Sequence, residues 1–305
     1  MWINDDFSTV SPKLLTIYGY ICFMKIAQRF LDFYVQSSLH VSLCYVAFYT
    51  VVSLQLGFQP LTTELAAVGS STLVGYNLAK YVHLYRSDFP FKQVIIPLTL
   101  VCTLIGLVFV WLLGIYAVVL FSFCGLLTLF YSLPQILGKS FRQIPILKLV
   151  TIGLSWSLLA MILPHLIEEV PVVVSFNGAY ETQSRTFSSD LIWEFVKYLL
   201  FVIALCVPFE IRDLKYDADN LKTLPQLIGV KRTKYIGLAL LFACGFTELY
   251  QLENSFQESI TTVVVLIITA LSIWLADKFK SDYYASLFVE AIPVLWLGLY
   301  VLLEI

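Results

Sequence analysis

Residues 94–133 read VIIPLTLVCTLIGLVFVWLLGIYAVVLFSFCGLLTLFYSL and contain no charged side chain. A helix needs about 20 apolar residues to cross the hydrocarbon core of a bilayer, which is roughly 30 Å thick. The run from Val94 to Leu133 is about twice that length, so it predicts two successive spans with a turn at Gly114. Lipid offers no hydrogen-bond partner to backbone amides, and both segments are therefore expected to be α-helical.

The rest of the chain has the same character, with 59% hydrophobic and 13% charged residues over a length of 305. A soluble domain carries about 25% charged residues, so a soluble fold is excluded. The net charge of −2 argues against a nucleic-acid partner. We predict an all-α, polytopic membrane protein of about nine transmembrane helices. The expected spans are 38–57, 61–82, 93–112, 115–133, 146–166, 191–209, 234–251, 259–277 and 285–303.

The domain organisation follows from these spans. Residues 1–35 mix basic and apolar side chains, which indicates an N-terminal segment that lies at the membrane interface. Residues 36–305 are expected to form one helical bundle, so that the whole chain is a single membrane domain.

Charge is distributed unequally between the two ends of the expected spans. All of the 19 lysines and arginines, except Arg185 and Lys197, lie in the N-terminal segment, in the connections after spans two, four, six and eight, or at the span ends beside these connections. Cytoplasmic loops carry the excess of basic residues, so this pattern predicts a cytoplasmic N-terminus. With an odd number of spans, the C-terminus is expected outside.

The connection after the sixth expected span reads PFEIRDLKYDADNLKTLP, residues 208–225. Asp213 and Asp217 are four residues apart, so on a helix both carboxylates point to the same side. Such a pair repels unless a cation lies between its members, and proteins bind Mg²⁺ through one or two carboxylates together with water and substrate phosphate. Nearby basic residues would hold the remaining phosphate charge: Arg212, Lys215 and Lys222. The alternative is a solvated loop of mixed charge.

This segment resembles the second aspartate motif of the UbiA superfamily of intramembrane prenyltransferases. Asp213 and Asp217 are followed by Lys222-Thr223-Leu224-Pro225 and by Leu227-Ile228-Gly229. The family has nine helices with this motif in the loop after the sixth, as expected for this chain. Tyr131-Ser132 and Lys139, after the fourth expected span, are similar to its Tyr/Lys loop motif. They are equally well explained as a span end with an anchoring lysine.

The family's first motif, Asn-xxx-Asp-xxx-Asp at the end of helix two, is only partly present. Asn77 matches the asparagine, but Tyr81 and Tyr85 stand at the positions of the two aspartates. The family binds diphosphate through metal ions held by both motifs. This chain has carboxylates at only one of the two motifs, so they can form at most one complete metal-binding site. Superposing the two segments places Lys80 beside Arg212, where basic side chains would replace part of the missing metal charge.

The resemblance implies a prenyltransferase that binds an isoprenoid diphosphate at the cytoplasmic membrane face and passes the prenyl group to an unknown acceptor. The isoprenoid tail would lie in a cavity open to membrane lipid. Asp213 and Asp217 would hold Mg²⁺, and Asn77 would orient the substrate. The expected substrate-binding residues are Arg212, Lys215, Lys222, Lys80, Tyr81, Tyr85 and Lys139.

Two other functions remain open at this point. The first is a non-catalytic member of the family that binds an isoprenoid lipid or a membrane partner, which the incomplete first motif favours. The second, a transporter, has less support because the spans lack an array of charges.

Some charged residues nevertheless fall inside the expected spans. Glu194 and Lys197 are three residues apart on one helix and are expected to pair, because a lone charge in a span is costly. Glu290, in the last span, has no partner close in sequence, and an intramembrane carboxylate is a functional candidate by default.

Overall fold

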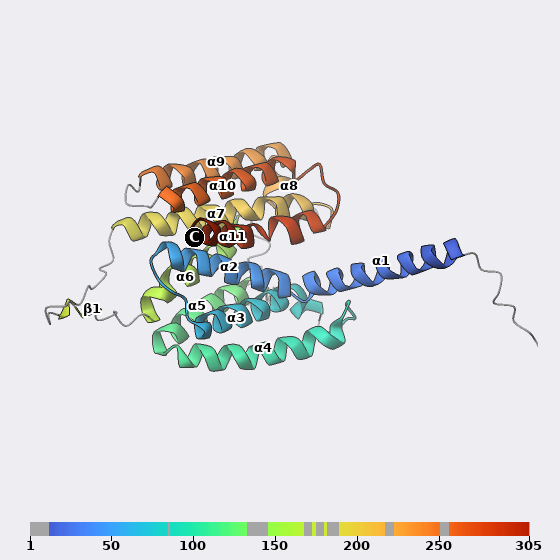
Figure 1. The fold of residues 1–305 in the computed structure, drawn as a ribbon, viewed down its shortest axis with the longest axis horizontal. Coiled ribbons are helices and arrows are strands. Elements are labelled where there is room, and N and C mark those ends of the chain that lie inside the picture. The colour runs from blue at the N-terminus through green and yellow to red at the C-terminus, as the bar shows by residue number, and fades with distance from the viewer. Residues whose placement is uncertain are drawn as a thin grey trace, which may run out of the picture.

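The computed structural model describes residues 12–84, 86–132, 146–167, 173–174, 180–181, 189–216, 223–250 and 256–304. These residues form α-helices joined by short connections (Figure 1). The α-helices are α1 (Pro12–Gln36), α2 (Leu39–Gln55), α3 (Thr62–Tyr81), α4 (Lys92–Leu112), α5 (Ile115–Ser132), α6 (Leu147–Ile167), α7 (Ser189–Asp213), α8 (Leu224–Ile228), α9 (Val230–Tyr250), α10 (Phe256–Leu275) and α11 (Ile292–Glu304). The remaining elements are a 3₁₀ turn η2 (Val82–Leu84), a π-helix η5 (Tyr284–Val289) and the antiparallel strand pair β1 (Val173–Val174) and β2 (Tyr180–Glu181).

The long helices from α2 to α11 close into a ring. Successive long helices pack against one another along the chain, and α11 packs against α2, so that the last helix lies beside the first of the ring. Additional contacts between α2 and α6 and between α7 and α10 tie the ring across its middle. Figure 1 shows α9 and α10 on one side of the bundle and α4 on the opposite side.

Helix α1 extends away from this bundle (Figure 1). The axes of its last part and of α2 differ by 57°. The bend falls at Ser37 and Ser38, and Ser38 has the left-handed backbone conformation that commonly ends a helix (φ 64°). The bend separates the predicted N-terminal segment from the bundle.

Aromatic side chains fill the middle of the bundle. The ring of Phe48 on α2 lies 6.0 Å from Phe201 on α7, 5.8 Å from Trp156 on α6 and 6.5 Å from Trp296 on α11. All four side chains are almost fully buried. Four helices that are distant in sequence therefore meet around Phe48.

Glycines set the spacing of some helix pairs. A Cβ atom at Gly153 on α6 would lie 2.9 Å from Ile203 Cγ1 and 3.0 Å from Leu199 Cδ1 on α7. Small residues allow membrane helices to approach closely enough for van der Waals packing. The close approach of α6 and α7 matters because both helices contribute to the site described below.

The predicted pair within α7 is confirmed. Lys197 Nζ lies 2.8 Å from Glu194 Oε2 and also 2.8 Å from Glu248 Oε2 on α9. The second carboxylate joins α7 to α9, which the sequence did not indicate.

The protein is an all-α, integral membrane protein, as predicted. Among the described residues, five helical stretches are long and apolar enough to cross a membrane, and there are six if the bent pair α1–α2 is counted as one span. They are Lys92–Leu112, Leu147–Ile167, Leu191–Asp213, Gln257–Leu275 and Tyr284–Leu303. A helical segment lies at each of the other expected spans too, but the count of nine crossings stays a prediction, as does the single-domain boundary.

Candidate functional site

A cavity of about 870 Å³ lies inside the bundle, between α3, α4, α5, α6 and α7. Its volume is within the range of roughly 300–1,000 Å³ that small-molecule sites in proteins occupy. Apolar side chains such as Val110, Phe121 and Leu159 line much of the wall. Gly125 on α5 also lines it, and a Cβ atom there would meet nothing within 4 Å. The cavity therefore offers an apolar chamber with free space beside α5.

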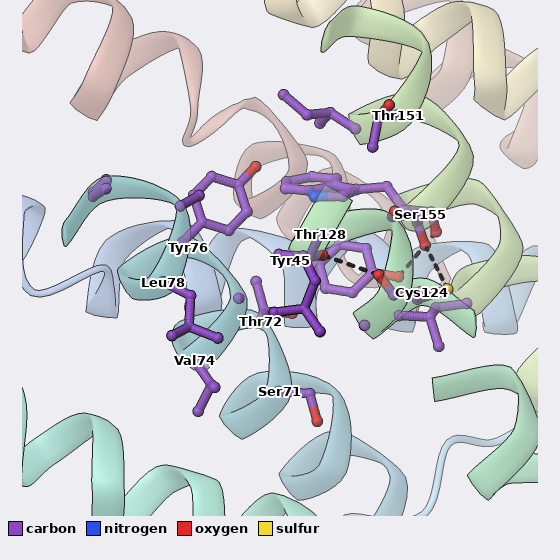
Figure 2. Close-up of a pocket in the computed structure, with 18 of the residues that line it drawn as sticks. Tyr45, Ser71, Thr72, Val74, Tyr76, Leu78, Cys124, Thr128, Thr151 and Ser155 are labelled. Atoms are coloured by element: carbon purple, nitrogen blue, oxygen red, sulfur yellow. Dashed lines mark hydrogen bonds between the residues drawn. The ribbon is translucent and has the colours of Figure 1, made fainter. Parts of the chain in front are cut away.

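Aromatic rings from three helices line the cavity, and Figure 2 labels Tyr45 and Tyr76 among them. The ring of Tyr45 on α2 lies 4.5 Å from that of Trp156 on α6, and its hydroxyl donates a hydrogen bond to the Trp156 carbonyl (2.9 Å). The ring of Tyr76 on α3 lies 6.5 Å from Trp156. The electron-rich faces of such rings attract a cation.

One end of the cavity is polar. It is formed where α3 ends, where α6 begins and where α7 ends, and the segment between η5 and α11 adds one more carboxylate. Its charged residues are Lys80, Lys148, Glu210, Arg212, Asp213 and Glu290. The predicted Lys80 and Arg212 thus reach the same end of one cavity, although they lie on different helices.

The end of α7 is organised by ion pairs. Lys148 Nζ on α6 lies 2.6 Å from Glu210 Oε1 and 3.4 Å from Asp213 Oδ2. Arg212 donates to Asp213 Oδ1 from Nη2 (2.7 Å) and from Nε (2.8 Å). Pairing of this kind offsets the cost of taking charges out of water. The carboxylate of Asp213, a predicted Mg²⁺ ligand, therefore already contacts two cations.

The end of α3 contacts the last turn of α1. Lys80 Nζ donates to the Val35 carbonyl (3.3 Å) and to Ser38 Oγ (3.0 Å), and the Tyr81 hydroxyl donates to the Gln36 carbonyl (2.8 Å). These carbonyls belong to the last turn of α1, where helical partners are missing. Lys80 and Tyr81 thus hold the junction between α1 and α2, and only Lys80 also lines the cavity.

Asn77, the matching residue of the first motif, faces α4. Its Nδ2 donates to Thr99 Oγ1 (2.8 Å), and its Oδ1 is buried without a hydrogen-bond partner among the described residues. It is not among the residues that line the cavity. The role predicted for Asn77 in orienting substrate stays a prediction.

Lys215 lies outside the cavity on the exposed end of α7. Its Nζ contacts Asp282 Oδ1 (2.6 Å), and the hydrogen bonds with Asp282 and Tyr216 raise the pKa of Lys215. The neighbouring Tyr216 does line the cavity. Four other predicted site residues lie outside the described residues: Asp217, Lys222, Tyr85 and Lys139.

Two residues of the polar end had no specific role in the sequence interpretation. Lys148 was counted only among the basic residues that predict the orientation, and nothing in its local sequence signals a partner 65 positions away. Glu290 was named a functional candidate because of its position in the last span, but no ligand was assigned to it.

The donor set at the polar end suits a hard cation such as Mg²⁺, because its carboxylate oxygens are the ligands that Mg²⁺ prefers. Glu210 and Asp213 are engaged by Lys148 and Arg212, whereas Glu290 has no hydrogen bond or ion pair from its side chain among the described residues. Within those residues, no group of three or more His, Cys, Asp or Glu side chains converges as a preformed metal cage. The polar end thus fits a cation that brings further ligands with it.

Comparison with solved structures identifies this architecture. A UbiA homologue from Aeropyrum pernix K1, in its apo form, superposes with a TM-score of 0.63 at 14% identity, over 87% of this chain and 98% of that one. A UbiA homologue from Archaeoglobus fulgidus bound to GPP and Mg²⁺ gives 0.62 at 12% identity, over 89% and 98%. A digeranylgeranylglyceryl phosphate synthase gives 0.53 at 14% identity, over 90% and 98%.

Sequence comparison adds nothing to this result, since no protein-family model and no curated protein matches the chain. The resemblance to the UbiA superfamily is confirmed at the level of the fold.

Proposed function

Since the chain has the fold of the UbiA homologues, we propose that it binds an isoprenoid diphosphate and transfers the prenyl group to an acceptor. The observation that carries the proposal is one continuous cavity, apolar along most of its length and lined by Lys80, Lys148 and Arg212 at one end. A prenyl diphosphate has the same division, with an apolar tail and a strongly anionic head. The homologue from Archaeoglobus fulgidus, bound to GPP and Mg²⁺, holds a ligand of this class.

The diphosphate would lie at the polar end. Lys148 and Arg212 would donate charge-assisted hydrogen bonds to phosphate oxygens, which are stronger than neutral ones. Asp213, together with the predicted ligand Asp217, would hold Mg²⁺. Bound there, Mg²⁺ would neutralise the charge that develops on the departing diphosphate.

The transfer step would occur where the aromatic rings meet the polar end. Breaking the bond between the prenyl carbon and its phosphate oxygen leaves an allylic cation, which Tyr45, Tyr76 and Trp156 would face. Their rings would stabilise it. The acceptor then forms the new bond to the prenyl carbon and loses a proton.

The orientation proposed for this site follows from charge. The polar end is formed by the end of α3, the start of α6 and the end of α7, which border basic connections in the sequence. By the positive-inside rule this face would lie in the cytoplasm. The apolar chamber would then extend toward the outer side of the membrane. The isoprenoid tail of the ligand would lie in this chamber, in contact with membrane lipid.

The alternative function is a non-catalytic protein that binds an isoprenoid lipid. Two observations favour it: Asp213 is engaged by Arg212 and Lys148, and Tyr81 donates to the Gln36 carbonyl where the family has an aspartate. A lipid binder needs the chamber but no metal.

Binding of geranyl diphosphate to the purified full chain, with and without MgCl₂, tests the proposal. We expect Mg²⁺-dependent affinity that Asp213→Asn weakens and that Gly125→Trp abolishes, because the indole fills the open space beside α5. Geraniol measures binding of the apolar tail alone, and inorganic pyrophosphate measures binding of the diphosphate head alone. Equal binding of geraniol and geranyl diphosphate, unaffected by Mg²⁺ or by Asp213→Asn, would establish the non-catalytic alternative instead.

A further inference from the structure

Glu290 is the carboxylate at the polar end that forms no ion pair with another described residue. It lines the cavity together with Lys80 and Arg212, and these two cations attract it electrostatically. No described residue hydrogen-bonds with its side chain or lies within ion-pairing distance of it, whereas Glu210 and Asp213 both have such partners. Glu290 is therefore available to a ligand in the cavity.

An unusual piece of backbone brings Glu290 to this position. It follows the π-helix η5, and its amide donates to the Ala285 carbonyl five residues earlier (3.1 Å). The Leu287 carbonyl lies 2.9 Å from His40 Nε2 on α2. The wider π-helical turn contains about one residue more than an α-helical turn. With an ordinary α-helical turn the side chain of Glu290 would therefore be rotated by about 100° around the helix axis. π-Helical turns occur frequently at functional sites.

The formal charges of the residues at the polar end balance one another. Three cations, Lys80, Lys148 and Arg212, lie with three carboxylates, Glu210, Asp213 and Glu290. A diphosphate entering alone would meet carboxylates as well as bases. A divalent cation that enters with it removes this repulsion, and Mg²⁺ is commonly held by one or two carboxylates plus substrate phosphates.

We propose that Glu290 is a ligand of the Mg²⁺ that accompanies the diphosphate, and that it supplies from the last helical segment the carboxylate that α3 lacks at Tyr81. This inference rests on the proposed function. Glu290 can coordinate the cation without giving up an ion pair, whereas Asp213 must share its oxygens with Arg212 and Lys148.

The test compares the parent chain with Glu290→Gln and with a matched control, Asp277→Asn. Asp277 pairs with Lys234 on α9, and neither of these two residues lines the cavity. Both variants remove one negative charge, so only the position differs. Geranyl diphosphate affinity is measured calorimetrically in detergent over a series of MgCl₂ concentrations.

Mg²⁺ is expected to increase the affinity for geranyl diphosphate, and the measured quantity is the Mg²⁺ concentration that gives half of this increase. For Glu290→Gln we expect this concentration to rise at least about tenfold, as for the loss of a group that supports a bound metal. Asp277→Asn should follow the parent curve. If Glu290 only repels phosphate, Glu290→Gln will bind more tightly by the same factor at every Mg²⁺ concentration, and that result would overturn the inference while leaving the proposed function intact.

Two further outcomes are informative. A parent chain that binds no geranyl diphosphate at any Mg²⁺ concentration overturns the proposed function, and this inference with it. If thermal melting shows that Glu290→Gln does not fold, Glu290→Asp replaces it, because that variant keeps the charge but shortens the reach of the carboxylate. An unchanged Mg²⁺ curve for Glu290→Asp would then count against the inference.

Discussion

Lys148 is the residue on which the polar end of the cavity depends. It joins the start of α6 to Glu210 and Asp213 at the end of α7, with N–O distances of 2.6 and 3.4 Å. Lys148 also lines the cavity. Under the proposed function its ammonium group would exchange a carboxylate for a phosphate oxygen when the ligand enters, so that the side chain would serve both structure and binding.

We predict that Lys148→Gln weakens geranyl diphosphate binding by at least about tenfold, since a hydrogen bond to a charged group contributes about 1.5–3 kcal/mol. Calorimetric titration measures the change. Glu210 is 3% exposed and would lose its ion-pair partner in the single variant. The double variant Lys148→Gln/Glu210→Gln removes this unpaired buried charge and keeps the net charge of the parent chain. Lys278→Gln, at an exposed position that does not line the cavity, is the control. Unaltered affinity in the double variant would contradict the role of Lys148.

At the scale of elements, the junction between α1 and α2 explains why α3 carries a tyrosine at position 81. The Tyr81 hydroxyl donates to the Gln36 carbonyl, and its ring stacks on Phe89 at 4.3 Å. An ionised aspartate has no proton to donate and would place its charge against a carbonyl oxygen. The departure from the family motif thus has a local structural consequence.

We expect Tyr81→Phe to lower the free energy of unfolding by about 0.5–1.5 kcal/mol, the usual contribution of one hydrogen bond. Tyr81→Asp, which restores the family residue, should destabilise the chain more because it also loses the ring stack. Thermal unfolding in detergent would measure both. An aspartate variant as stable as the parent would show that the junction does not depend on Tyr81.

The contact between α6 and α7 gives a second test at this scale. Gly153→Val should lower the melting temperature, because the new Cβ would lie 2.9 Å from Ile203 Cγ1, so that the Ile203 side chain or α7 itself must shift. Gly298→Ala on α11 is the control, since nothing lies within 4 Å of its Cβ position. There we expect no loss, or a gain of up to about 1 kcal/mol from the better helix former. A Gly153→Val variant that melts like the parent would show that the two helices do not need this close approach.

For the whole molecule, the main prediction is its orientation in the membrane. The basic connections after alternate spans predict a cytoplasmic N-terminus, and an odd number of crossings then places the C-terminus outside. A reporter enzyme that is active only outside the cytoplasm, fused after Ile305, should be active. The same reporter fused in the connection after α7 should be silent. Activity of the second fusion alone would reverse the orientation and place the polar end outside.

Much of the architecture could be read from the sequence. The stretch from Val94 to Leu133 predicted two helices with a turn at Gly114, and α4 and α5 are separated there, with Gly114 at φ 96°. The pair Glu194 and Lys197 was predicted from its spacing and is present. These features are local, because helix length, turn residues and neighbouring charges on one helix depend on residues close in the chain.

The site was predicted less completely. Asp213 and Arg212 were identified from their motif, and both line the cavity. Asn77 and Tyr81 were assigned from the same family pattern, but they contact Thr99 and Gln36 instead of the cavity. A motif gives the order of residues along a helix, whereas the direction of each side chain depends on what packs against that helix.

The sequence by itself determined that this protein is a membrane bundle and where its charged ends lie. Bilayer thickness and the cost of burying charge act on each segment separately, so they leave a pattern that can be read along the chain. Only the tertiary structure decided that Lys148 pairs with the end of α7 and that Glu290 faces the same cavity as Lys80 and Arg212. Those partners lie on different helices, many residues apart, and they meet because the ring closes and the aromatic core around Phe48 fixes its geometry.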